Sequence, residues 1–186
     1  MCGIVGYSLR NPGMRDLDSA CAAMKHRGPD GEGTFYATNT RVGLAHVRLS
    51  IIALSNYADQ PFSDLSNNYV LVYNGEAYNF NELASMSNHP QPTEVFSDTE
   101  ALFEFLKHRS ISNLSAINGI FAFAFYDNAN DELWIARDGF GVKPLYYSVT
   151  DDGVFFASEL RALLKLGVQL SPPDPVVASR YLRYLW

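Results

Sequence analysis

The stretch Gly119-Ile120-Phe121-Ala122-Phe123-Ala124-Phe125-Tyr126 decides the fold that we expect for this chain. Its phenylalanines alternate with alanines, which is the period of two of a β-strand, and both faces of that strand are apolar. A strand that is apolar on both faces lies in a sheet that is covered on both sides. The sequence therefore predicts an interior strand with packed layers above and below it.

Further strands and helices are predicted on either side of this stretch. Branched and aromatic residues predict strands over 3–8, 34–37, 42–48, 69–73, 133–136, 145–149 and 154–157. Apolar residues at helical spacing predict helices over 17–24, 78–86 and 158–166 and another that begins at Ser97, while the prolines of 88–95 predict a loop. Short connections such as Asp151-Asp152-Gly153 favour antiparallel pairing. We therefore expect an α+β protein, a four-layer αββα sandwich of two mainly antiparallel sheets.

The composition is that of an ordinary globular protein, with 186 residues, 47% hydrophobic and 18% charged. The formal net charge is −6 and the basic residues are scattered, so nucleic acid is not an expected partner. The chain has neither a long apolar stretch nor the layout of a signal peptide at its start, so we expect a cytoplasmic protein without a membrane partner. Two cysteines and four histidines without ligand spacing argue against a disulfide scaffold and against a metal site.

Cys2 stands directly behind Met1 and leads into a short apolar run. If Met1 is removed, Cys2 carries both a thiol and a free α-amine, and an α-amine with an ordinary pKa of about 7.7–8.0 is a suitable proton acceptor at neutral pH. Nucleophile and base are then parts of one residue. The alternative is an ordinary small apolar side chain at the start of a strand.

Four further segments combine with Cys2. They are Ala-His-Val-Arg-Leu-Ser-Ile-Ile at 45–52, Tyr-Asn-Gly-Glu at 73–76, Ser-Asp-Thr-Glu at 97–100 and Arg-Asp-Gly-Phe-Gly-Val-Lys-Pro-Leu-Tyr-Tyr at 137–147. Together they resemble the class II glutamine amidotransferase domain, an N-terminal nucleophile hydrolase, in the form found in glutamine-dependent asparagine synthetase. The resemblance extends from Cys2 to about Leu164. It implies the N-terminal nucleophile hydrolase fold and the hydrolysis of L-glutamine to glutamate and ammonia, without a metal or cofactor in this domain.

The resemblance also implies a role for each residue of the motifs. Cys2 attacks the side-chain amide of glutamine, and the Asn74 amide and the Gly75 backbone N–H stabilise the oxyanion. Arg48 binds the α-carboxylate of the substrate through two parallel hydrogen bonds, and Asp98 binds its α-ammonium. The same pocket is lined by Leu49, Ser50, Ile51, Ile52 and Glu76.

Structural interpretations stay open for three of these positions. Asn74-Gly75 is a strong signal for a two-residue hairpin turn, and a turn can itself expose the Gly75 N–H. Ser97-x-x-Glu100 before an apolar stripe is typical of a capping box, in which Asp98 only favours the positive N-terminus of the helix. Arg48 alone is typical of a solvated cation at the end of a strand.

The resemblance and the composition divide the chain into three parts. Residues 2–166 form the type 2 glutamine amidotransferase domain, the proline-rich residues 167–175 form a linker, and 176–186 form the helical start of an absent synthetase domain. ATP and Mg²⁺ are expected only in that synthetase domain, because the Ser-Gly-Gly-x-Asp-Ser phosphate loop of full-length family members does not occur here.

The expected partners are L-glutamine and a synthetase domain or a separate synthetase subunit, and a homodimer is left open. The most direct expectation is that ammonia converts aspartate to asparagine. The alternatives are an amidotransferase subunit that serves a different acceptor and an inactive or regulatory glutamine-binding module.

Overall fold

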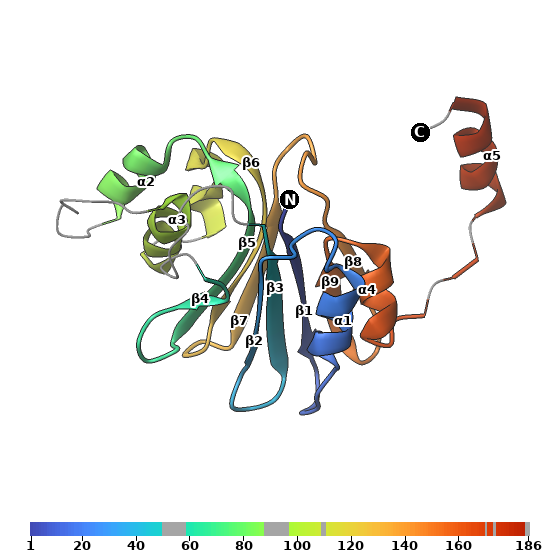
Figure 1. The fold of residues 1–186 in the computed structure, drawn as a ribbon, viewed down its shortest axis with the longest axis horizontal. Helices are drawn as coiled ribbons and strands as arrows, with labels where there is room; N and C mark the ends of the chain where they lie inside the picture. The colour runs from blue at the N-terminus through green and yellow to red at the C-terminus, as the bar shows by residue number, and fades with distance from the viewer. Residues whose placement is uncertain (50–58, 88–96, 109–110, 170, 173, 185–186) are drawn as a thin grey trace.

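A computed structural model describes residues 1–49, 59–87, 97–108, 111–169, 171–172 and 174–184. Two antiparallel sheets lie face to face, and helices cover the outer face of each sheet (Figure 1). This arrangement confirms the predicted four-layer αββα sandwich and the α+β class. The loop predicted over 88–95 lies outside the described residues.

The first sheet has the strand order β2-β3-β1-β9-β8. Its strands are β1 (Gly3–Leu9), β2 (Gly31–Tyr36), β3 (Val42–Arg48), β8 (Tyr146–Val149) and β9 (Gly153–Ala157). The central strand β1 pairs with β3, where Ile4 is opposite His46, and with β9, where Gly6 is opposite Phe156. Buried side chains of α1 (Leu17–Ala23) and α4 (Leu160–Lys165) pack on the outer face of this sheet.

The second sheet has the order β4-β5-β6-β7. Its strands are β4 (Phe62–Ser63), β5 (Tyr69–Ala77), β6 (Gly119–Asp127) and β7 (Glu132–Arg137). The helices α2 (Phe80–Met86) and α3 (Asp98–Lys107) cover its outer face, and a 3₁₀ helix, Ile111–Ala116, precedes β6. Sequence patterns did not predict β4 or the 3₁₀ helix, which are both short.

Strand β6 is apolar on both faces, as its alternation predicts. Phe121, Phe123 and Phe125 pack with buried residues of α3, whereas Ala122 and Ala124 belong to the apolar layer between the two sheets. Small side chains on the inner face let the sheets pack closely, and aromatic side chains fill the wider space under the helices.

The largest correction concerns β5, which the sequence predicts to stop at Tyr73. The strand continues to Ala77, and Asn74 and Gly75 are paired with Ala122 and Phe121 of β6. The hairpin-turn interpretation of Asn74-Gly75 is therefore wrong. A turn preference is a local effect, and nine consecutive pairs with a neighbouring strand outweigh it.

The starts of three other elements differ from the prediction by two or three residues. β2 begins at Gly31 and not at 34, and α2 begins at Phe80 and not at 78. α4 begins at Leu160 because Ser158 is held against β1: its N–H donates to the Ile4 carbonyl at 2.8 Å, and its hydroxyl accepts from the Ile4 N–H at 3.0 Å. The predicted end at 166 is confirmed to within one residue, and Gly167, directly after it, has a positive φ of 89°.

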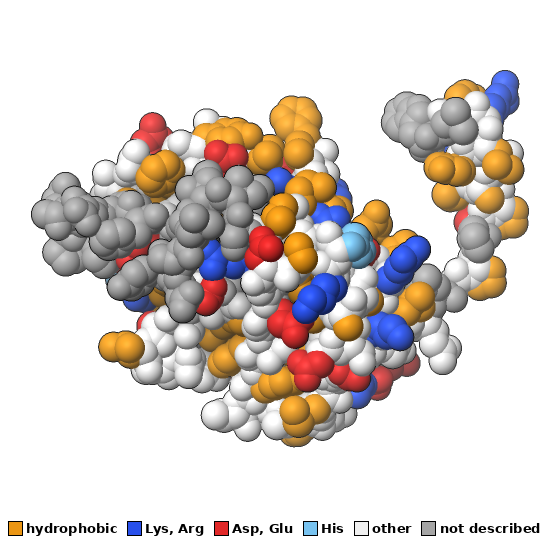
Figure 2. Space-filling view, viewed as in Figure 1, with side chains coloured by type: hydrophobic (Ala, Val, Ile, Leu, Met, Phe, Trp, Pro, Cys, Tyr) orange, Lys and Arg blue, Asp and Glu red, His pale blue; other side chains and the backbone are white. Residues whose placement is uncertain are grey.

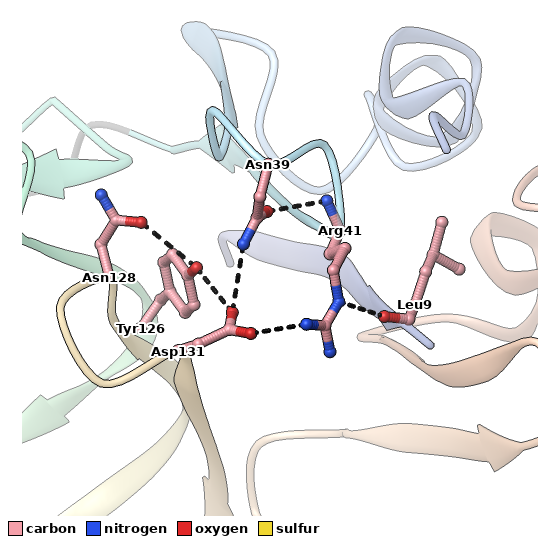
Figure 3. Close-up of polar contacts among 6 residues, drawn as sticks. All are labelled: Leu9, Asn39, Arg41, Tyr126, Asn128 and Asp131. Atoms are coloured by element: carbon pink, nitrogen blue, oxygen red, sulfur yellow. Dashed lines mark hydrogen bonds and ion pairs between the residues drawn. The ribbon is translucent and has the colours of Figure 1, made fainter. Parts of the chain in front are cut away.

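An ion pair joins the two sheets at the end of β1 that is opposite to Cys2. The Arg41 guanidinium donates to Asp131 at 2.8 Å and to the Leu9 carbonyl at 3.0 Å (Figure 3). Asp131 also accepts from the Tyr126 hydroxyl at 3.0 Å and from the Asn39 amide at 3.3 Å. We call these five residues the far-end clamp. It links the turn between β2 and β3 to the turn between β6 and β7.

The predicted C-terminal helix is present as α5 (Pro175–Tyr184), which stands apart from the sandwich (Figure 1). None of its described residues is buried, and Val177 and Leu182 are among its exposed apolar residues. Figure 2 shows apolar side chains on the surface of this helix. Among the helices that the structure describes, none is long and apolar enough to cross a membrane.

Candidate active site

Cys2 precedes β1 and lies beside the end of β3. The Leu49 N–H donates to the Cys2 Sγ at 3.4 Å, and the thiol faces the Leu49 carbonyl at 3.8 Å. The pairing of Gly3 with Val47 brings the first residues of β1 next to the last residues of β3. The predicted nucleophile and the predicted substrate-binding residues Arg48 and Leu49 are therefore neighbours, although they are far apart in the sequence.

The Arg27 side chain supports the backbone of Cys2 and is itself held by Glu159. Arg27 Nε donates to the Cys2 carbonyl at 3.0 Å, and Arg27 Nη1 pairs with Glu159 at 3.3 Å. Glu159 also contacts His26 Nε2 at 2.9 Å. Because 132 residues separate Arg27 from Glu159, spacing in the sequence contains no signal for this pair.

Asn74 is buried with 2% of its surface exposed, and its Nδ2 has no hydrogen-bond partner among the described residues. Side chains alternate along β5, and Val70 and Val72 face the first sheet, so Asn74 faces it as well. An unpaired buried amide costs about 1–3 kcal/mol, and most buried polar groups are paired. This donor is therefore available to an oxygen atom of a ligand.

Gly75 lies on the edge of β5 that faces away from β6, beyond the two residues that are paired with β4. On this edge the Tyr73 N–H donates to Gln60 Oε1 at 2.6 Å, and the Ala77 N–H donates to Asp98 Oδ2 at 3.1 Å. Successive N–H groups of a strand point to opposite edges, so the Gly75 N–H points in the same direction as those of Tyr73 and Ala77. It is placed between two N–H groups whose acceptors are side chains.

Asp98 is the first residue of α3 and is bound to β5. Its Oδ2 accepts from the Tyr73 hydroxyl at 2.9 Å as well as from the Ala77 N–H. Ser97 caps the helix by accepting from the Glu100 N–H at 3.2 Å, which confirms that half of the predicted capping box. The carboxylate of Asp98 does more than favour the helix N-terminus, because it joins the helix to the strand of Asn74 and Gly75.

Arg48 is not the solvated cation of the alternative interpretation, because only 12% of its side chain is exposed. Its Nη1 donates to Asp59, of which 61% of the side chain is exposed. Glu76 is exposed at the surface of β5. The predicted pocket residues Ser50, Ile51 and Ile52 lie outside the described part of the chain.

His46 is a buried polar residue that the sequence motifs did not single out. It is on β3 with 1% of its surface exposed, and its Nε2 has no partner within the described ranges. Burial lowers its pKa to about 3, although a hydrogen bond to the Tyr73 backbone acts in the opposite direction and raises the pKa. The ring is therefore neutral at physiological pH. The described residues contain no cluster of three or more His, Cys, Asp or Glu side chains that could hold a metal ion.

A solved structure shares this architecture. The glutamine phosphoribosylpyrophosphate amidotransferase from Bacillus subtilis, complexed with ADP and GMP, matches 89% of this chain and 44% of its own with a TM-score of 0.69 and 23% identity. The fold is therefore that of the N-terminal nucleophile hydrolases.

The sequence model described as the glutamine amidotransferase domain matches residues 1–185, and the chain belongs to this family. It is 37% identical to asparagine synthetase [glutamine-hydrolyzing] 1 of Bacillus subtilis, over 88% of the chain and 27% of that protein. It is 33% identical to amidase chry2 of Gibberella zeae, over 91% of the chain and 27% of that protein. The chain thus spans about a quarter of the length of these relatives.

Proposed function

We propose that this domain hydrolyses L-glutamine to L-glutamate and ammonia, with Cys2 as the nucleophile after removal of Met1. The observation that carries the proposal is the buried Asn74 amide, whose Nδ2 has no partner among the described residues. Membership of the glutamine amidotransferase family and the position of Cys2 beside Arg48 and Leu49 support the same reaction. Met1 is 57% exposed and is therefore accessible to an aminopeptidase.

The reaction proceeds in two acyl-transfer steps. The α-amine of Cys2 takes the proton of the thiol, the sulfur attacks the amide carbon of glutamine, and the C–N bond breaks as the α-ammonium gives this proton to the nitrogen, which leaves as ammonia. Water then attacks the thioester with the α-amine as its proton acceptor, the C–S bond breaks, the sulfur takes the proton back, and glutamate leaves. Each step passes through a tetrahedral oxyanion, for which Asn74 Nδ2 and the Gly75 N–H are the donors in this proposal.

Two charged side chains recognise the free amino acid. Arg48 binds the α-carboxylate, which replaces Asp59 as the partner of the guanidinium. Asp98 binds the α-ammonium. Among the described residues, Leu49 and Glu76 line the rest of the pocket in this proposal.

We further propose that the amidotransferase domain comprises residues 2–166 and that 167–175 form a linker. In this proposal the exposed helix α5 belongs to residues 176–186 as the start of a synthetase domain. That domain would take up the ammonia and, with ATP and Mg²⁺, convert aspartate to asparagine. The relative that is named an asparagine synthetase favours aspartate as the acceptor of the ammonia. The relative that is named an amidase favours a different acceptor, which is the second candidate.

The test is glutamate release from L-glutamine by protein whose N-terminal mass has been determined. Processed protein should be active, and Cys2→Ala should be inactive. Cys21→Ala is the matched control and should keep its activity, because Cys21 is buried in α1. Asn74→Ala should lower kcat by about 10²–10³-fold.

Two results would contradict the proposal. Equal glutamate release by Cys2→Ala and the processed parent would exclude Cys2 as the nucleophile. Processed protein that binds glutamine without releasing glutamate would instead be a regulatory binding module.

A further inference from the structure

Among the described residues, the hydrogen bonds to the Asp98 carboxylate come from one side. Within the described residues, both of its recorded hydrogen bonds go to Oδ2, from the Tyr73 hydroxyl at 2.9 Å and from the Ala77 N–H at 3.1 Å. Both donors belong to β5. The orientation of this carboxylate, and with it the direction of Oδ1, is therefore set by one strand.

Tyr73 is well suited to this task because its own position is fixed. It is 3% exposed and packs in the apolar layer under α2 and α3, and its N–H donates to Gln60 Oε1 at 2.6 Å. Burial and then the charge of Asp98 raise the pKa of the Tyr73 hydroxyl above its ordinary value. The hydroxyl consequently stays protonated and remains a donor to Asp98 at all physiological pH values.

Tyr73 also directly precedes Asn74 and Gly75. Strand β5, which presents the two proposed oxyanion donors, thus also orients the carboxylate of Asp98. In the proposed function this carboxylate binds the α-ammonium at the other end of the substrate. If Tyr73 loses its hydroxyl, the Ala77 N–H remains as the donor to Asp98 within the described part of the chain, and the carboxylate can turn about its terminal torsion.

We propose that Tyr73 is a positioning residue: its hydroxyl orients Asp98 so that Oδ1 receives the α-ammonium of glutamine. The inference rests on the proposed function, in which Asp98 binds that group. It extends the function to specificity, because Tyr73 then strengthens the preference for an amide substrate with a free α-amine.

The experiment is calorimetric binding of L-glutamine to the 186-residue chain in a Cys2→Ala background, in which no turnover occurs. Tyr73→Phe should weaken binding about tenfold, which corresponds to about 1.4 kcal/mol. Tyr126→Phe is the matched control: it removes a tyrosine–aspartate hydrogen bond in the far-end clamp and should leave the affinity unchanged. Melting curves of the two variants show whether both proteins are folded.

A double-mutant cycle separates positioning from a general loss of structure. Asp98→Asn should weaken binding by itself, and Tyr73→Phe should cost nothing more in the Asp98→Asn background, because there is no longer a carboxylate to orient. In protein with an active Cys2, Tyr73→Phe should raise KM for glutamine and leave kcat almost unchanged.

Equal affinity of the Tyr73→Phe and parent proteins would overturn the inference, as would a full tenfold loss in the Asp98→Asn background. If Tyr73→Phe does not fold, the affinity and KM of Asp98→Asn for glutamine take its place as the test. Values equal to those of the parent protein would overturn the inference, because Tyr73 could then not act through Asp98. Binding without glutamate release would refute the proposed hydrolysis, yet the cycle would still decide the role of Tyr73. A Cys2→Ala protein that does not bind glutamine would refute both.

Discussion

Asp138 is the carboxylate whose replacement tests the packing of this fold most directly. It follows β7, is 6% exposed and accepts four hydrogen bonds from backbone N–H groups. Oδ1 accepts from Phe140 at 3.1 Å and Val142 at 3.0 Å, and Oδ2 accepts from Phe121 at 3.2 Å and Lys143 at 3.1 Å. The side chain thereby ties the loop after β7 to β6.

The substitution Asp138→Asn preserves the shape of the side chain and replaces one of its two oxygens with an NH₂ group. In either orientation of the amide, two backbone N–H groups then face a donor in place of an acceptor. A hydrogen bond to a charged group contributes about 1.5–3 kcal/mol, so the loss of two predicts a decrease of about 3–6 kcal/mol in the free energy of unfolding.

Urea denaturation at pH 7 measures this loss. The control is Asp127→Asn at the end of β6, where Oδ1 accepts from the N–H groups of both Ala129 and Asn130 and Oδ2 accepts from the exposed Asn130 side-chain amide at 2.8 Å. An asparagine retains one oxygen for the two backbone donors and gives up one hydrogen bond that is exposed to water, so the control should lose less than about 1 kcal/mol. A loss of that small size in Asp138→Asn would refute the reasoning.

The pH dependence of stability provides a second measurement on the same pair of proteins. Burial raises the pKa of Asp138, but the four N–H donors outweigh it and hold the pKa below its ordinary value. Between the folded and unfolded pKa values only the unfolded state binds the proton, so this contribution is complete above about pH 4 and is lost on further acidification. The parent should therefore lose stability more steeply below pH 4 than Asp138→Asn does.

Three more predictions concern the clamp, the second cysteine and the buried histidine. Arg41→Ala breaks the ion pair with Asp131 and should cost about 1 kcal/mol in urea denaturation without changing glutaminase activity, because the far-end clamp is remote from Cys2. Burial raises the pKa of Cys21 to about 12, so iodoacetamide at pH 7.5 should label Cys2 and not Cys21 in peptide mass mapping. Burial lowers the pKa of His46 to about 3, so the NMR chemical shifts of its ring should stay constant from pH 7 to 4.5. A titration midpoint near 6.5 would contradict its burial. Because only the unfolded state binds the proton below about pH 6.5, the contribution of His46 to stability should fall as the pH decreases from that value.

The layers of the fold follow from patterns within single segments. The alternation in β6 predicted a strand that is covered on both faces, and the helical stripes predicted the covering helices. β2 shows where such patterns fail, since Gly31 and Gly33 have low strand propensity and yet lie in the strand. A Cβ at Gly33 would lie 2.3 Å from the Gln60 carbonyl, so glycine is needed there for a contact with a distant segment. A short stretch of sequence around Gly33 does not show this contact, so the need for glycine there could not be predicted from local patterns.

The candidate site was predictable in its residue types and not in its contacts. The motifs named Cys2, Arg48, Asn74 and Asp98, but the hydrogen bond from Tyr73 to Asp98 depends on the packing of α3 against β5. The turn preference of Asn74-Gly75 was misleading for the same reason, because pairing with β6 decides the local conformation.

The continuation of β5 through Asn74 and Gly75 changes how the proposed oxyanion donors work. A hairpin turn would present them on a connection with water on several sides, whereas a paired strand holds the backbone in a fixed register and sends successive side chains to opposite faces. Asn74 consequently faces the first sheet, while Tyr73 faces α3 and reaches Asp98. Stabilising a developing charge needs donors that do not reorganise during the reaction, and a strand within a sandwich meets that need better than a turn.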